Sequence, residues 1–191
     1  MRFIYESSMI SRSEALELLH HYMHEEYHIQ HALSVEAIMH ALADYLQQDK
    51  ELWGMVGLLY DLDCEYTFDQ PENHAILTAQ IIKGLIPEKG ITAILAHNYV
   101  HTNVIPTTII DKALLVSDAV TDLIIASAQS MISKKIKRLT ATTIRKNLKD
   151  ESFTTKGIKE KLLLCTDLGI DTNKLVVLSL NSLQNIRSSL V

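Results

Sequence analysis

The stretch TTIIDKALLVSDAVTDLII, residues 107–125, predicts a long helix and decides the fold class. Its apolar residues recur every three or four positions, as on the buried face of a helix. Thr107 or Thr108 is suited to cap this helix, because a threonine hydroxyl accepts a hydrogen bond from the first turn. Asp118 lies within the apolar part. Burying a carboxylate there is unfavourable without a cation or hydrogen-bond donors, so Asp118 is a candidate site residue; an ordinary ion pair is the alternative explanation.

Helical periodicity continues on both sides of this stretch. Ser11 and Glu14 form a capping-box pattern, so a first helix should begin near residue 12. The 6 glycines and 3 prolines are too few for a strand-rich fold, which needs more turn residues. The prediction is an all-α bundle. Its expected helices cover roughly residues 12–26, a segment after His31 that includes 35–46, then 51–59, 76–84, 91–99, 108–125, 142–150, 155–168 and 173–190.

No repeat or low-complexity linker divides the chain. A single domain over residues 1–191 is therefore expected, with a core over about 12–130 and a C-terminal helical extension over about 131–191. Charge follows this division. Residues 1–130 hold 6 Lys and Arg against 18 Asp and Glu, whereas residues 131–191 hold 12 against 5, so the two parts carry −12 and +7. This asymmetry suggests two tasks, or a cleft where opposite charges meet.

The overall net charge of −5 disfavours general nucleic-acid binding, and no nucleic-acid partner is expected. Cys64 and Cys165 have neither a metal-binding nor a disulfide spacing, so reduced thiols are expected. The first residues lack the apolar segment of a signal peptide, and no stretch has the length of a membrane helix. We expect a soluble, cytoplasmic protein without a membrane partner.

Nine histidines, all within the first 101 residues, are the main chemical signal. A single surface histidine usually has no specific role, so position must select among them. Three candidate residues have a distinctive setting. His31 starts an apolar helix, Asp61 follows the apolar segment LWGMVGLL of residues 52–59, and Asp118 lies in the long helix.

The order of these residues resembles the HD-domain superfamily of metal-dependent phosphohydrolases. That family's signature is a His, then a His-Asp pair at the end of an apolar helix, then a distant Asp. The C-terminal segments SKKI and LLLCTDLGI resemble the tail of a bacterial branch of predicted HD hydrolases. The matching segments, over roughly residues 15–130, are HALSVEAIMHALADYL (31–46), ELWGMVGLLYDLD (51–63), NHAILTAQII (73–82), AILAHN (93–98) and DKALLVSDAVTDLI (111–124).

The resemblance implies an HD-domain-like helical bundle that holds one or two divalent metals. His31, Asp61 and Asp118 match the family's metal ligands. His74 and His97 match positions that in some members bind a second metal or contact phosphate. The resemblance further implies catalytic roles for Asp61 and His97, a cofactor among Mn, Fe, Ni, Zn and Mg, and a small phosphorylated substrate such as a nucleotide.

Tyr60 stands where the family has the His of the His-Asp pair. A neutral phenol is a poor ligand for these metals, so metal affinity should be weaker than in the family. Two hypotheses follow. One is a divalent-metal-dependent phosphohydrolase with a weakened or rewired metal site. The other is a catalytically inactive binding module that uses the same pocket.

Two other histidine pairs have the i, i+4 spacing of helical zinc ligands. The segment HEEYH, from His24 to His28, fits the zinc-protease motif HExxH. The Gly and third His of its extended form are missing, so a solvated helix end is the preferred interpretation. His97 and His101 form the second pair, but neighbouring asparagines suggest that the helix ends between them.

A basic segment containing Lys134 and Lys135 follows the long helix that carries Asp118. A solvated face is the simpler interpretation. In the functional alternative, one of these lysines folds back over the acidic pocket and binds a substrate phosphate. The segment has no interleaved aromatic residues, which makes a nucleic-acid groove the weaker option.

Overall fold

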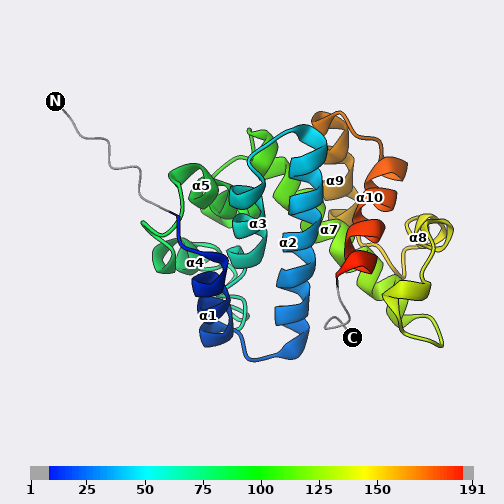
Figure 1. The fold of residues 1–191 in the computed structure, drawn as a ribbon, viewed down its shortest axis with the longest axis horizontal. Helices are drawn as coiled ribbons and strands as arrows, with labels where there is room; N and C mark the ends of the chain where they lie inside the picture. The colour runs from blue at the N-terminus through cyan, green and yellow to red at the C-terminus, as the bar shows by residue number, and fades with distance from the viewer. Residues whose placement is uncertain (1–8, 187–191) are drawn as a thin grey trace.

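The computed structural model describes residues 9–186, and within that range the chain is helical without strands (Figure 1). This confirms the predicted all-α class. The α-helices are α1 (Arg12–Tyr22), α2 (Glu26–Leu46), α3 (Lys50–Leu59), α4 (Ile76–Ile81), α5 (Glu88–His97), α6 (Tyr99–Thr102), α7 (Ile109–Gln129), α8 (Ala141–Asn147), α9 (Lys156–Leu163) and α10 (Thr172–Asn185). Two 3-10 helices are η1 (Ile136–Arg138) and η2 (Leu164–Leu168).

Side-chain caps determine where most of these helices begin. Ser11 and Glu14 form the expected capping box at α1, and Thr108 forms another at α7. Capping satisfies backbone N–H groups that have no partner within the helix, so the capping residues in the sequence predict where these helices begin. The same role at α3, α8, α9 and α10 is taken by Asp49, Thr140, Thr155 and Asp171.

The junction between α1 and α2 differs from the expectation. α1 ends at Tyr22 instead of continuing to residue 26, and α2 already begins at Glu26, so that His31 does not start this helix but follows its first turn. The Glu65 carboxylate accepts hydrogen bonds of 2.9–3.1 Å from the backbone N–H groups of His24 and Glu25. This contact to the junction comes from a residue 40 positions away, which local patterns cannot reveal.

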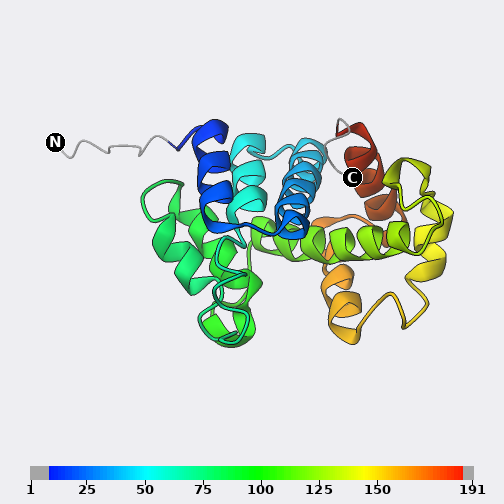
Figure 2. The same cartoon turned by 90° about the horizontal axis from the view of Figure 1, so that it is seen from below.

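α2, α3 and α7 form the centre of the bundle. α2 packs most extensively on α3, and α7 contacts α2, α5, α9 and η2. Figure 2 shows α7 between a layer formed by α1, α3, α2 and α10 and the helix α9 on its other side. α2 and α3 approach so closely that a Cβ atom at Gly57 would lie 3.0 Å from the backbone of Glu36. The close contact of these two helices therefore requires glycine at position 57.

The C-terminal helices pack directly on this centre. α9 and η2 lie against α7, and α10 lies against α2. Leu162, Cys165 and Leu175 belong to the same buried hydrophobic cluster as α2 and α3. Cys64 and Cys165 are both free thiols, as expected. Among the described helices, none combines the length and apolar character needed to span a membrane.

Candidate metal centre

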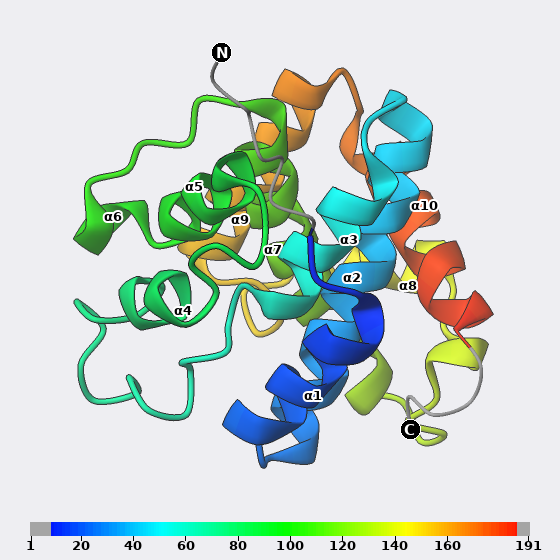
Figure 3. The ribbon, with the colours of Figure 1, turned by 60° about the vertical axis from the view of Figure 1, so that its left-hand side comes forward.

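The candidate site lies at the C-terminal end of α3. Residues 52–59 are all buried, and the chain then turns and presents Tyr60, Asp61 and Asp63. α4, α5 and α6 lie together beside α3 (Figure 3). His74 comes from the turn before α4, and His97 is the last residue of α5. The packing of these short helices therefore brings histidines to the acidic end of α3.

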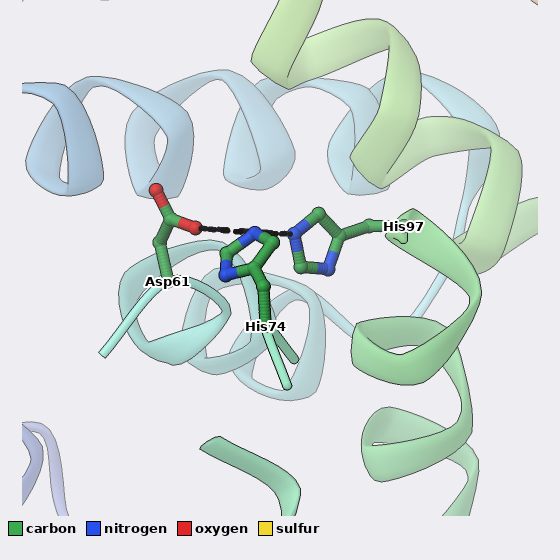
Figure 4. A group of neighbouring side chains, drawn as sticks. All are labelled: Asp61, His74 and His97. Carbon is green, nitrogen blue, oxygen red and sulfur yellow. Dashed lines mark hydrogen bonds and ion pairs between the residues drawn. The ribbon is translucent and has the colours of Figure 1, made fainter. Parts of the chain in front are cut away.

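Asp61, His74 and His97 form a first group, the Asp61 cluster (Figure 4). The Nε2 atoms of the two histidines are 2.9 Å apart. Asp61 Oδ1 lies 3.2 Å from His74 Nε2 and 3.8 Å from His97 Nε2. Three donor atoms of the types that bind divalent metals therefore converge on one point, and this group could hold a metal ion.

The outer nitrogen of each of these histidines is held by an oxygen. Asp63 Oδ1 accepts a hydrogen bond from His74 Nδ1 at 2.8 Å, and the Ile94 carbonyl accepts one from His97 Nδ1. Because these oxygens can only accept, both Nδ1 atoms carry protons. Neutral rings then direct two unprotonated Nε2 atoms at each other, which is repulsive unless a proton or a metal ion lies between them. A carboxylate or carbonyl behind each histidine is also the usual arrangement at metal-binding histidines.

Burial and neighbouring charges act differently on the three groups. Burial, reinforced by the charge of His74, lowers the pKa of His97 to about 4. Burial raises the pKa of Asp61 to about 6, although the charge of His74 opposes this. Burial alone would lower the pKa of His74, but its hydrogen bond to Asp63 and the charge of Asp61 raise it. The hydrogen bond to Asp63 and the charge of Asp61 thus favour the protonated form of His74, whereas burial favours the neutral form of His97.

His31, Asp118 and Asp122 form a second group, the His31 cluster, between α2 and α7. His31 Nε2 lies 3.0 Å from Asp122 Oδ1 and 3.9 Å from Asp118 Oδ1. The ligand-type atoms of this group also lie within 4.8 Å of one another. Burial alone would lower the pKa of His31, but the hydrogen bond with Asp122 and the charge of Asp118 raise it.

Tyr60 lies between the two clusters. Its hydroxyl is 3.0 Å from Asp118 Oδ1 and 3.1 Å from His31 Nδ1. Since a carboxylate only accepts, the hydroxyl donates to Asp118 and accepts from His31. The ring is buried and meets the ring of His97 edge-on, with 5.0 Å between the centroids. Burial and the charge of Asp118 raise the pKa of Tyr60, so this side chain remains a neutral phenol.

Lys161 brings a positive charge to the His31 cluster from α9. Its Nζ lies 2.8 Å from Asp118 Oδ2. Burial alone would raise the pKa of Asp118, but the charges of Lys161 and His31 hold it well below its ordinary value. The pKa of Lys161 is raised in turn, because the attraction of Asp118 outweighs the effect of burial. Asp118 is thus an ionised carboxylate paired with an ammonium group.

The residues expected from the sequence fall into two clusters instead of one set. Asp61 meets His74 and His97, whereas His31 and Asp118 meet each other. Asp122 could have been found from its i, i+4 spacing to Asp118, which places both carboxylates on one helix face. No sequence signal links Lys161 to the site. The residues that sequence reasoning missed are Asp63, Asp122 and Lys161.

The lysine at Asp118 is Lys161, not Lys134 or Lys135. Both of the latter are exposed and follow the end of α7 at Gln129. The C-terminal half of α7 is continuous from Asp118 to Gln129, so about 16 Å of helix separates this carboxylate from the start of the basic turn. The basic part of the chain reaches Asp118 only later in the sequence, through Lys161 of α9. The structure therefore leaves Lys134 and Lys135 on an exposed basic turn, as in the simpler interpretation.

The two rival histidine pairs are each interrupted by a helix end. His24 lies between α1 and α2, so His24 and His28 do not share a helix face. His28 Nδ1 contacts the Glu65 carboxylate at 2.9 Å instead. Asn98 separates His97 in α5 from His101, which is exposed in α6. The preferred interpretations of both pairs agree with this arrangement.

Comparison with family models, curated proteins and solved structures gives no match for this chain. The site is therefore defined by its own geometry, as two adjoining groups of His and Asp side chains that could hold metal ions.

Proposed function

We propose that this protein is a divalent-metal-dependent phosphohydrolase of the HD-domain type that acts on a small phosphorylated molecule such as a nucleotide. The observation that carries the proposal is the convergence of Asp61 Oδ1, His74 Nε2 and His97 Nε2 within 2.9–3.8 Å of one another. The order of the motif residues along the chain supports it independently. The mixed imidazole and carboxylate set suits Mn, Fe, Ni or Zn better than Mg.

Each residue of the Asp61 cluster has a distinct part in this proposal. Asp63 and the Ile94 carbonyl keep the Nε2 atoms of His74 and His97 directed inward. Asp61 contributes the negative charge that a cation requires. A divalent cation bound there would acidify water and stabilise negative charge on a phosphoryl group. Lys161, held at Asp118, would add a fixed positive charge that acts on His97 and Asp61.

The test compares His97→Ala with His101→Ala, because the second histidine is exposed and lies outside both clusters. Protein purified without chelator is analysed for metal by mass spectrometry and assayed with Mn²⁺ and Ni²⁺ on phosphomonoesters and nucleotides. We expect bound metal and turnover in the wild type and in His101→Ala, and loss of both in His97→Ala. A wild-type protein that neither retains nor takes up metal would refute the hydrolase proposal.

A catalytically inactive binding module is the second candidate, and Tyr60 favours it. Its hydroxyl lies at Asp118, where the family pattern supplies a histidine ligand. In that case the pocket would bind a phosphorylated molecule without turnover. Calorimetry with the same substrate panel separates the two functions. Saturable binding without product over a long incubation supports the binding module, whereas metal-dependent product release supports the hydrolase.

A further inference from the structure

The two clusters differ in how their donor atoms are satisfied. In the Asp61 cluster, three metal-binding atoms face one another, with both Nδ1 protons directed outward. In the His31 cluster, by contrast, both oxygens of Asp118 and one nitrogen of His31 contact Lys161 or Tyr60, which lie outside the cluster. Asp118 Oδ2 is paired with Lys161 and Asp118 Oδ1 with Tyr60, while the two nitrogens of His31 meet Tyr60 and Asp122.

We infer that the Lys161 ammonium and the Tyr60 hydroxyl together take the place of a second metal ion beside Asp118, so that the centre holds one divalent cation, in the Asp61 cluster. The inference rests on the proposed function for the cation in the Asp61 cluster. At the site beside Asp118 it assigns Lys161 and Tyr60 in place of a metal ion.

The chemistry of Lys161 fits this role. An ammonium is a compact point charge, and its contact of 2.8 Å places that charge directly on a carboxylate that is only 16% exposed. Tyr60 occupies the other oxygen of the same carboxylate and one nitrogen of His31, which removes two further ligand atoms. A metal ion entering here would have to displace both groups and overcome repulsion from the nearby ammonium.

The packing of α9 holds the Lys161 ammonium in the place of the second metal ion. α9 packs against α7, and the side chain of Lys161 reaches inward to Asp118 from that interface. The other lysines of α9 behave differently. The side chain of Lys156 is 91% exposed, against 34% for Lys161, and the partners of Lys156 and Lys159 are the surface carboxylates of Glu160 and Glu151. Lys156 therefore provides a matched control on the same helix.

Manganese stoichiometry tests the inference. Equilibrium dialysis against Mn²⁺ is carried out on the full chain, on Lys161→Met with Tyr60→His, and on Lys156→Met. We expect one ion per chain in the wild type and in Lys156→Met, and two in the double variant. Adding Asp122→Asn to the double variant should return the count to one. Two ions in the wild type, or a single ion in the folded double variant, would overturn the inference.

A second measurement uses only the wild type, so it does not depend on whether the double variant folds. The electron paramagnetic resonance spectrum of Mn²⁺-loaded protein, freed of unbound ion by gel filtration, should show the six-line signal of an isolated ion. The spectrum of a coupled manganese pair would contradict the inference.

The same stoichiometry measurements distinguish failure of the proposed function from failure of this inference. A wild type that binds no ion refutes the metal at the Asp61 cluster. The exclusion by Lys161 would still be supported in that case if the double variant gained one ion that disappears with Asp122→Asn but persists with His97→Ala.

Discussion

At the scale of single residues, the hydroxyl of Tyr60 connects two groups that cannot both accept its proton. Because Asp118 is ionised, the hydroxyl donates to it, and His31 must donate to the hydroxyl oxygen. His31 also meets the carboxylate of Asp122 through its other nitrogen. The ring is therefore an imidazolium, which agrees with the raised pKa of His31.

Tyr60→Phe tests this hydrogen-bond pattern. The substitution keeps the ring but leaves Asp118 Oδ1 and His31 Nδ1 without a protein partner in a buried place. We expect the free energy of unfolding in urea to fall by roughly 1–3 kcal/mol. Tyr66 is 52% exposed, so Tyr66→Phe serves as control and should change stability by less than about 0.5 kcal/mol. Equal effects of the two substitutions would contradict the assigned role.

Asp63 acts on the Asp61 cluster through His74. Its carboxylate is completely buried, accepts from His74 Nδ1 and also accepts from the Thr78 backbone N–H at 3.0 Å. Asp63→Asn weakens the hold on the ring, and we expect metal affinity to drop by about 10–100-fold in a Mn²⁺ titration. Asp69→Asn, at an exposed position, should leave affinity unchanged. A circular dichroism melt verifies that both variants remain folded.

At the scale of helices, Glu65 shows how one side chain sets a boundary. Its carboxylate accepts hydrogen bonds from the backbone of His24 and Glu25, directly before α2, and contacts His28. Burial alone would raise the pKa of Glu65, but the hydrogen bonds from His28 and from the backbone lower it. A lowered carboxyl pKa stabilises the fold above the unfolded-state value near 4.5, and this stabilisation is lost as the pH falls through the folded-state pKa.

Glu65→Gln should therefore destabilise the protein in a pH-dependent manner. At pH 7 we expect a loss of about 1 kcal/mol in urea unfolding, the usual net contribution of a hydrogen bond. As the pH falls below 4.5 and through the lowered folded-state pKa of Glu65, the wild-type carboxyl is protonated as well, and the difference between the two proteins should shrink. Glu72→Gln, at an exposed position of the same loop, controls for loss of charge alone. A difference that stays constant from pH 7 to pH 3 would rule out this role for Glu65.

The contact between α2 and α3 depends on the missing side chain of Gly57. A Cβ atom there would lie 3.0 Å from backbone atoms of Glu36, so Gly57→Ala forces the two helices apart. We expect a destabilisation of roughly 1–3 kcal/mol. Gly157 in α9 offers the matched control, because its Cβ would meet no atom closer than 3.9 Å. Gly157→Ala should stabilise the protein by roughly 0.5–1 kcal/mol, since alanine favours a helix. Thermal melts should show a lower Tm for Gly57→Ala and a higher Tm for Gly157→Ala than for the wild type.

Much of this element structure could be predicted from the sequence, and the exceptions share a cause. The capping boxes at Ser11 and Thr108 are local patterns, and both helices begin there. Glu65 binds the backbone between α1 and α2 from 40 and 41 positions away, and Lys161 pairs with Asp118 from 43 positions away. Contacts between residues so far apart in the sequence form only when the helices pack, so local sequence patterns do not predict them.

At the scale of the whole molecule, the uneven charge acquires a structural meaning. All the residues of the two clusters lie in the acidic part of the chain, whereas Lys161 comes from the basic part. The sequence suggested either separate tasks or a cleft where charges meet. Packing of α9 on α7 brings opposite charges of the two parts together in the pair of Lys161 with Asp118. Lys112 with Asp167 adds an ion pair of opposite polarity between the same two parts.

The Asp61 cluster ties three segments together, so metal binding should stabilise the entire fold. Its members follow α3, precede α4 and end α5. A ligand that binds only the folded state at 100 times its Kd adds about 2.7 kcal/mol, which corresponds to a Tm increase of roughly 5–10 °C for a chain of this size. Scanning calorimetry with Mn²⁺ or with chelator should show this increase in the wild type and in His101→Ala, but not in His97→Ala. Protons compete for His74, whose pKa is raised because Asp63 and Asp61 outweigh the lowering effect of burial, so the increase should be larger at pH 8 than at pH 6. An increase that is independent of pH, or that survives His97→Ala, would place the metal outside the Asp61 cluster.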